Sequence, residues 1–176
     1  MNPIPSQPTC VITGTTGYLG GRIKDAVQQR RWRAIDLNRR AENSSAAVFR
    51  LGEDISPASL AGATALVHCA YDFKKSSWMD IRATNVVGSE KLFRAARQAK
   101  VERLIYISSI SAYEDCRSLY GKAKLESERI AFSFGATVIR PGLIWGEPGG
   151  AMFGKLQDEV QHGRLLPLIG GGRRPC

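Results

Sequence analysis

The sequence predicts an α/β fold: a doubly wound parallel sheet with helices on both faces. Three observations lead to this prediction. Short apolar runs rich in β-branched residues alternate along the chain with stretches that carry apolar residues at helical spacing. These runs are apolar at nearly every position, as expected for strands covered on both faces of a sheet. A cluster of glycines follows the first run, where a parallel α/β unit turns from strand to helix.

Six apolar runs are expected to be strands and three amphipathic stretches to be helices. The strands are predicted at residues 9–13, 33–38, 47–51, 65–70, 103–108 and 136–140, and the helices at 18–30, 77–100 and 120–134. The stretch 77–100 carries Gly88, Ala95 and Ala96 on one face, which predicts close packing there. The alternation favours parallel pairing, because parallel strands need long crossover connections.

Length and composition indicate one globular unit. The chain has 176 residues, of which 43% are hydrophobic and 23% charged, and it holds no apolar run long enough to cross a bilayer. Residues 1–8 contain three prolines and lack the basic start and apolar core of a secretion signal. We therefore expect a flexible arm at 1–8 and a cytoplasmic location.

Four cysteines are scattered through the chain without paired spacing. This argues against a zinc site and against a disulfide framework, so reduced thiols and no bound metal are expected. Cys10 and Cys69 are expected to lie in strands. His68 is interpreted as a strand residue and His162 as a solvated one, neither of them a metal ligand.

The formal net charge of +9 fits either nucleic acid or a small polyanion such as a dinucleotide or nucleotide sugar. Basic residues are spread along the chain, and no aromatic-rich basic sheet motif accompanies them. The pattern favours a small ligand, and we expect no nucleic-acid partner.

Gly14, Gly17 and Gly20 form a G-x-x-G-x-x-G turn between the first strand and the first helix. Glycine allows a tight turn, close approach of the backbone to a pyrophosphate, and close packing of helix on strand. The helix start also directs unpaired N–H groups and a positive dipole end toward phosphate. A glycine-rich turn without a ligand is the alternative. The residues expected to bind a dinucleotide here are Gly14, Thr16, Gly17, Tyr18 and Leu19.

The end of the second strand reports on which dinucleotide is held, because an acid there bonds ribose hydroxyls and an arginine accepts a 2′-phosphate. Asn38, followed by Arg39 and Arg40, occupies this position, which favours NADP over NAD. Asp36 lies two residues earlier, and a register shift would restore an acid. Asp54, with Ile55 beside it, is expected near the adenine, but a helix-capping role for Asp54 or Ser56 is the alternative.

Tyr120 and Lys124 stand four residues apart at the start of the last predicted helix, so they share one face. A lysine ammonium beside a phenol favours phenolate, and we expect it to lower the pKa of Tyr120 toward neutrality for proton exchange with an alcohol or carbonyl. Ser109 ends the fifth strand, where it is placed to hold the same substrate oxygen. A surface helix with no catalytic role is the alternative interpretation of the pair.

Taken in order, these motifs resemble the short-chain dehydrogenase/reductase superfamily, and particularly its extended, NAD-dependent epimerase/dehydratase branch. The resemblance covers nearly the whole chain, from Thr9 to about Gly172. The stretches that carry it are TGTTGYLGG (13–21), GEDI (52–55), LVHCA (66–70), NVVGSEKLFRAA (85–96), YISSISAY (106–113), YGKAKLESE (120–128) and VIRPGLIWGE (138–147).

The resemblance implies a Rossmann-like NAD(P)-binding domain at residues 9–150 and a catalytic triad of Ser109, Tyr120 and Lys124. Lys124 would also bond the nicotinamide ribose, and Asn85 would help to hold the active-site loop. The remaining residues that it places around the cofactor are Cys69, Ala70, Tyr71, Ser108 and Pro141. A polar packing role for Asn85 and a strand-ending turn at 141–142 are the alternatives.

Three departures from the family pattern bear on function. Only eleven positions separate Ser109 from Tyr120, so the intervening loop must be tight. Ile110 and Ser111 stand where dehydratases of this branch carry an Asp-Glu pair, which disfavours a dehydratase. Residues 151–176 resemble only the start of a substrate-binding lobe, so the chain is either a fragment or a naturally shortened protein.

The expected function is that of an NAD(P)-dependent epimerase or reductase, which acts on a nucleotide sugar or related carbonyl or alcohol by hydride transfer. Tyr120 would be the proton donor or acceptor. A non-catalytic dinucleotide sensor or scaffold is the alternative. The long helices at 77–100 and 120–134 are expected to pair in a four-helix homodimer, as the family often does.

Overall fold

The structure, a computed structural model, describes residues 7–39, 47–144, 146 and 159–162. The chain divides into two compact units, Met1–Gly142 and Leu143–Cys176, and the fold below is that of the first. Most of the expected arm (1–8) and of the expected partial lobe (151–176), together with Arg40, lies outside the described residues.

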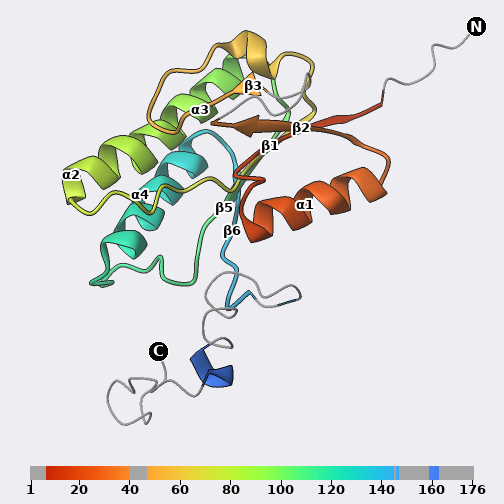
Figure 1. Ribbon diagram of the computed structural model, residues 1–176. Helices are drawn as coiled ribbons and strands as arrows, with labels where there is room; N and C mark the ends of the chain where they lie inside the picture. Colours follow the sequence, from red (N-terminus) through yellow and green to blue (C-terminus); the bar gives the residue numbers. More distant parts are fainter. Residues whose placement is uncertain (1–6, 40–46, 145, 147–158, 163–176) are drawn as a thin grey trace, which may run out of the picture. The chain divides into compact units, whose positions relative to one another are not determined.

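A six-stranded parallel sheet forms the centre of the first unit. Its order is β3-β2-β1-β4-β5-β6, so the chain reverses direction across the sheet between β1 and β4 (Figure 1). The strands are β1 (Thr9–Thr13), β2 (Arg33–Asn38), β3 (Ala47–Val48), β4 (Ala65–His68), β5 (Arg103–Ile107) and β6 (Thr137–Ile139). In open sheets of this kind, ligands bind at the carboxyl ends of the strands beside such a switch point. The expected doubly wound fold is confirmed.

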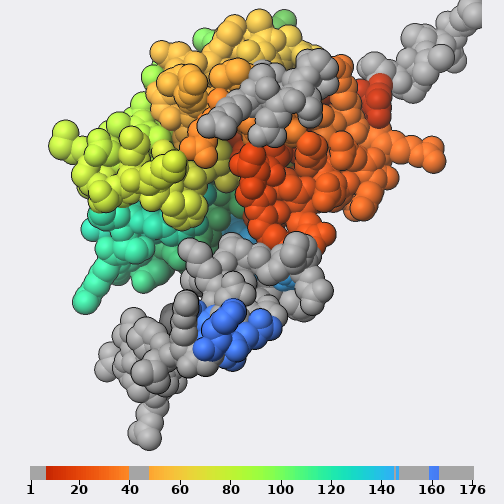
Figure 2. Space-filling view, viewed as in Figure 1, coloured from red at the N-terminus to blue at the C-terminus, as the bar shows by residue number. Residues whose placement is uncertain are grey.

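Helices cover both faces of this sheet, with α1 on one side and α3 and α4 together on the other (Figure 1). Their bounds are α1 (Tyr18–Gln29), α2 (Trp78–Ile81), α3 (Val87–Gln98) and α4 (Leu119–Ser133), with a short 3₁₀ helix at Pro57–Leu60. A π-helical turn, Arg82–Val86, joins α2 to α3, so the predicted helix 77–100 is one continuous run with a wider turn inside it. On the face seen in the space-filling view, α2 and α4 meet (Figure 2).

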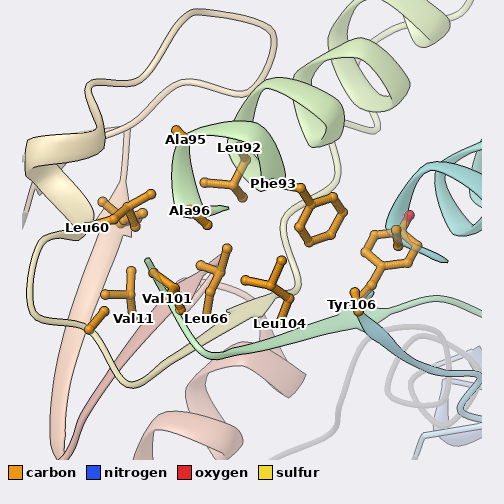
Figure 3. Packing of buried hydrophobic residues seen from close by; sticks show 14 of the residues in the cluster. Val11, Leu60, Leu66, Leu92, Phe93, Ala95, Ala96, Val101, Leu104 and Tyr106 are labelled. Carbon is orange, nitrogen blue, oxygen red and sulfur yellow. The ribbon is translucent and has the colours of Figure 1, made fainter. Parts of the chain in front are cut away.

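Alternating strand residues supply the two cores. Val11, Leu66 and Leu104 pack under α3 and α4 beside Leu92 and Phe93 (Figure 3). On the other face the core contains Cys10, Ile12, Ala65, Val67 and Ile107, against which α1 packs. The two-fold alternation of a strand thus sends neighbouring residues to opposite cores. In the central strands β1 and β4 every position except Thr9 is buried, which is why these runs are mostly apolar.

Four strands are shorter than expected, and local hydrogen bonds explain two of them. The N–H groups of Cys69 and Ala70 donate to Thr13 Oγ1 instead of continuing β4, so the prediction that Cys69 lies in a strand is wrong. After β3, the chain turns at residues 50–53, where the Glu53 N–H donates to the Arg50 carbonyl. The other two are β5, which ends at Ile107 instead of Ser108, and β6, which spans Thr137–Ile139 instead of 136–140. Cys10 lies in β1 as expected.

No helix in the described ranges is long and apolar enough to cross a membrane. Cys10, Cys69 and Cys116 are free thiols. Burial raises the pKa of Cys10 to about 11 and that of Cys69 to about 12, so both thiols hold their protons at neutral pH.

Candidate active site

The glycine turn after β1 has the close approaches that its sequence predicts. Gly14 has φ +74°, and a Cβ on it would stand 2.9 Å from the Ala70 backbone. A Cβ on Gly20 would stand 2.2 Å from the Gly14 carbonyl oxygen, closer than any side chain allows. Gly17 caps α1 without a side-chain hydrogen bond, and the first turn holds no acidic residue. The turn therefore leaves a side-chain-free cradle beside a helix start, which fits a diphosphate.

The end of β2 lies beside this turn. Asn38 is buried, and its Oδ1 accepts a 3.1 Å hydrogen bond from the Thr15 hydroxyl. Asp36 forms a 2.6 Å ion pair with Lys24 of α1. Its carboxylate therefore faces the helix and does not replace Asn38 at the strand end. Arg39 follows and is exposed.

The loop after β3 separates two roles that the sequence leaves open. Ser56, not Asp54, caps the 3₁₀ helix, since its Oγ accepts from the Ala58 N–H. The Asp54 side chain is 90% exposed and pairs with Lys91 at 3.1 Å. Its proposed contact with adenine stays a prediction.

A buried hydrogen-bond chain links β1, β4 and α3. Thr13 Oγ1 lies 2.7 Å from His68 Nδ1, and His68 Nε2 lies 2.8 Å from Ser89 Oγ. Ser89 donates its only proton to the Asn85 carbonyl at 2.6 Å, so it accepts from His68 Nε2–H. The neutral ring then accepts at Nδ1 from Thr13, whose oxygen accepts the N–H groups of Cys69 and Ala70. Burial, and secondarily Lys124, lowers the pKa of His68 to about 3, which keeps the ring neutral.

Asn85, in the π-helical turn, fixes the next part of the loop after β4. Its Oδ1 accepts from the Asp72 N–H at 2.7 Å, and its Nδ2 donates to the Asp72 carbonyl at 3.3 Å. Asn85 is therefore more than a packing residue. Residues 69–72 of this loop are held by polar side chains beneath them, and Cys69 and Ala70 lie directly against the glycine turn.

Ser109, Tyr120 and Lys124 come together at the carboxyl end of β5. Ser118 caps α4 by accepting from the Gly121 N–H, which starts the helix just before Tyr120. The Ser109 hydroxyl lies close enough to the Tyr120 side chain to lower the pKa of Tyr120. Lys124 is only 4% exposed, donates to the Ile107 carbonyl at 2.8 Å, and lies 6.0 Å from the centre of the Tyr120 ring.

The electrostatics of this group differ from the expectation. Burial raises the pKa of Tyr120, and the nearby Ser109 hydroxyl offsets only part of that rise. The expectation that Lys124 lowers the pKa of Tyr120 is therefore wrong, because the phenol is withdrawn from water and the ammonium lies over ring faces. Burial also lowers the pKa of Lys124, to about 8, although the nearby Glu128 carboxylate acts in the opposite direction.

A buried carboxylate that the sequence reasoning missed lies one turn beyond Lys124. Glu128 is 1% exposed, and Arg140 binds it through Nε–Oε1 at 2.7 Å and a second nitrogen on Oε2 at 2.5 Å. Burial would raise the pKa of Glu128, but the Arg140 hydrogen bond and the approach of the Ser108 hydroxyl, which lacks full hydrogen-bond geometry, hold it below its usual range. Its spacing of four from Lys124 was the available signal.

Arg140 leads directly into Pro141, the residue expected at the nicotinamide end. The Pro141 carbonyl accepts from the Ile110 N–H at 3.3 Å, and the Ile139 carbonyl accepts from Ser108 at 2.8 Å. The end of β6 is thus tied to the segment that carries Ser108 and Ser109. The Glu128–Arg140 pair ties the same strand end to α4.

Sequence reasoning also missed an aromatic cluster around Tyr120. The Phe73 ring stacks on Tyr120 at 5.6 Å and 23°, and Tyr71 meets Tyr120 edge to face at 4.9 Å. Phe73 is nonetheless 75% exposed. An aromatic residue three positions beyond Ala70 was a weak signal, since single exposed aromatics are common.

The sheet order, the glycine cradle and the Tyr-Lys pair on α4 define a dinucleotide-binding protein of the short-chain dehydrogenase/reductase type. Residues 10–138 match the model of the NAD dependent epimerase/dehydratase family. The chain therefore belongs to that family.

Individual relatives are distant. The chain is 25% identical to a 4-hydroxy-2-methyl-3-oxo-4-farnesyl-3,4-dihydroquinoline-1-oxide ketoreductase of Stigmatella aurantiaca, covering 91% of this chain and 57% of the relative. It is 23% identical to the decarboxylating sterol-4-alpha-carboxylate 3-dehydrogenase of Mus musculus, covering 97% and 55%. Among solved structures, UDP-glucuronic acid 4-epimerase from Bacillus cereus in complex with NAD aligns with a TM-score of 0.74 at 18% identity, covering 93% and 67%. The chain spans little more than half the length of these curated relatives.

Proposed function

We propose that this chain provides the cofactor-binding and proton-transfer parts of an NAD(P)-dependent enzyme that interconverts a secondary alcohol and a ketone. The reaction would be a net reduction or oxidation, or the transient oxidation within an epimerisation. The observation that carries the proposal is the group formed by Ser109, Tyr120 and buried Lys124. The ketoreductase and sterol dehydrogenase among the relatives support chemistry at a carbonyl or alcohol carbon.

The cofactor would lie along the carboxyl ends of β1, β2, β4 and β5. Gly14, Gly17 and the start of α1 would hold the diphosphate, and Asn38 and Arg39 the adenosine ribose. The loop at Cys69, Ala70 and Tyr71, with Ser108, Lys124 and Pro141, would line the nicotinamide half. When bound, the dinucleotide supplies the hydride that forms the new C–H bond and is itself oxidised. We propose NADP as the preferred form, because Arg39 follows β2 where an acid would favour NAD.

Each residue of the group has a distinct role in this proposal. Ser109 donates a hydrogen bond to the carbonyl oxygen and orients it. Tyr120 donates its proton to that oxygen as the alcohol forms, and its raised pKa keeps the phenol protonated before reaction. Lys124, held by the Ile107 carbonyl, is mostly protonated at neutral pH and stabilises the phenolate left behind.

Tyr120→Phe tests the proposal because it removes the transferable proton and keeps the ring. NADPH-dependent ketone reduction should fall by about 100-fold or more, while NADPH affinity measured by calorimetry changes by less than about twofold. The matched control is Tyr113→Phe on the exposed loop after Ser109, which should leave both quantities unchanged. If wild type binds NADPH and reduces none of a broad panel of ketones, the sensor or scaffold alternative replaces the enzyme.

Three further expectations stay predictions. A nucleotide sugar is one candidate substrate class. A homodimer through the helices at 77–100 and 120–134 is to be tested by sedimentation. A cytoplasmic location rests on the sequence alone.

A further inference from the structure

We propose that Phe73, together with Tyr71, forms an aromatic platform on Tyr120 that selects an apolar, ring-bearing alcohol or ketone as the substrate. This inference rests on the proposed function, since it places the substrate at Tyr120. The proposed function specifies only a secondary alcohol and a ketone, and the platform adds which class of alcohol or ketone is bound.

The first support is the arrangement of the three rings. Tyr71 and Phe73 lie 4.7 Å apart, and both lie within 5.6 Å of Tyr120, measured between ring centres. These spacings are those of stabilising aromatic pairs. Phe73 uses one face on Tyr120 and still leaves three quarters of its surface to solvent. A ring-shaped apolar molecule bound beside the Tyr120 hydroxyl would cover that surface.

The second support is that Phe73 is not on an unrestrained loop. The preceding Asp72 is bound through its backbone N–H and carbonyl to buried Asn85. The following Lys74 N–H donates to Asp72 Oδ1 at 2.9 Å. Both neighbours of Phe73 are therefore fixed, and the exposed ring is presented at a defined place. Its exposed apolar surface, held at a fixed place beside a proton donor, is available to a bound ligand.

The third support comes from the residues at and after the end of β5. The segment 107–113, which carries Ser109, contains no charged residue. Ile110, directly after Ser109, and Tyr113 are both more than half exposed, and the Ile110 backbone is fixed by its hydrogen bond to Pro141. The exposed side chains of this segment are thus apolar or aromatic, and a polyhydroxylated ring would leave its hydroxyls poorly paired against them.

The test compares 2-decalone, an apolar bicyclic ketone, with UDP-glucose in the full chain loaded with NADPH or NAD. We expect decalone reduction with a kcat/KM well above that for UDP-glucose epimerisation. Phe73→Ser should raise KM for decalone about tenfold with little change in kcat, because it removes stacked apolar surface and leaves Tyr120 in place. Phe73→Leu, which keeps an apolar side chain, should restore most of the loss.

Two controls separate this inference from others. Met79→Ser, which removes an exposed apolar side chain on α2 outside the ring cluster, should leave KM unchanged. Exchanging the exposed Lys74 and Lys75 together for Gln should also leave the KM for decalone unchanged, whereas it would weaken the binding of a diphosphate-bearing sugar. Preferential turnover of UDP-glucose, or an unchanged KM in Phe73→Ser, overturns the platform.

A separate binding measurement distinguishes failure of the platform from failure of the proposed function. Saturation-transfer NMR reports decalone contact without turnover. Contact that weakens in Phe73→Ser, with no reduction in wild type, supports the platform and contradicts the enzyme. Reduction that is indifferent to Phe73 supports the enzyme and contradicts the platform.

Discussion

Arg39 follows the last residue of β2 and is exposed, so its guanidinium can meet a 2′-phosphate without first breaking a core contact. Arg39→Gln should weaken NADPH binding by about tenfold and leave NADH binding nearly unchanged, as expected for loss of one charge-assisted contact. Calorimetric titration of both coenzymes measures the difference. Arg30→Gln, at the C-terminal end of α1 and so at the end away from the glycine turn, is the matched control for net charge. Tighter binding of NADH than NADPH by wild type would contradict the assignment.

His68 makes acid stability a test of the buried hydrogen-bond chain. Its pKa is about 3 in the folded protein and 6.5 for an ordinary histidine, so the unfolded chain takes up the proton first as the pH falls. Stability is therefore fully present above pH 6.5 and is lost as the pH falls from there toward 3. Between pH 7 and 5.5 the free energy of unfolding should fall by about 1.2 kcal/mol from this group.

Urea titrations at several pH values measure that slope. His162→Gln, at the exposed histidine, is the control and should retain it. A protein whose stability is flat between pH 7 and 5.5 would show that His68 is not neutral in the interior.

At this scale, the sequence predicts residue identity better than residue energetics. The spacing of Tyr120 and Lys124 and the strand-end position of Ser109 were sufficient to find the group. The raised pKa of Tyr120 was not predictable, because it depends on burial by Tyr71 and Phe73 from a distant loop. Glu128 was missed because a buried acid and an exposed one look alike on a helix until Arg140 is placed.

The packing of α1 on the β1 turn depends on the absence of a side chain at Gly20. Gly20→Ala should destabilise the protein by about 2 kcal/mol or more and weaken dinucleotide binding, because its Cβ would stand 2.2 Å from the Gly14 carbonyl. Thermal unfolding and NADPH titration give the two quantities. Gly21→Ala in the same helix meets Thr15 only at 3.3 Å and is the matched control, with a far smaller loss. Equal effects of the two substitutions would exclude close packing as the cause.

Element types were predictable, and their ends were less so. Apolar runs identified all six strands, but side-chain acceptors such as Thr13 Oγ1 divert backbone groups from the ladder, and this diversion is a tertiary event. The π-helical turn within 78–98 was hidden for the same reason. Apolar spacing fits a continuous helix, whereas the wider turn is associated with the contact of Asn85 with Asp72.

For the whole molecule, ligand binding should appear as stability. At about 100 times its Kd, a dinucleotide that binds only the folded state adds about 2.7 kcal/mol to the free energy of unfolding. For a chain of this size the melting temperature should rise by about 5–10 °C, as scanning calorimetry would show. Adenosine, which lacks the diphosphate, should give a much smaller rise at the same concentration as the dinucleotide. Equal rises would show that the glycine turn is not the main binding surface.

The doubly wound topology was predictable because strand and helix signals alternate and crossovers in parallel sheets follow one hand. The net charge of +9 was less informative, since it sets the sign of a partner and not its kind. Substrate class was beyond the sequence, because it depends on which side chains gather around Tyr120. That gathering joins residues 71–73 to 120 across separate elements.

The side chains of Thr13 and Asn85 hold the loop after β4 through hydrogen bonds to its main chain. Thr13 holds the amides of Cys69 and Ala70, and Asn85 holds both backbone groups of Asp72. None of these hydrogen bonds depends on the side chain of the residue that it holds. Substitutions at 71 and 73 therefore leave the hydrogen bonds that hold this loop unchanged. Evolution of the chain can alter these two side chains, and with them the substrate, while the backbone of the loop keeps its position.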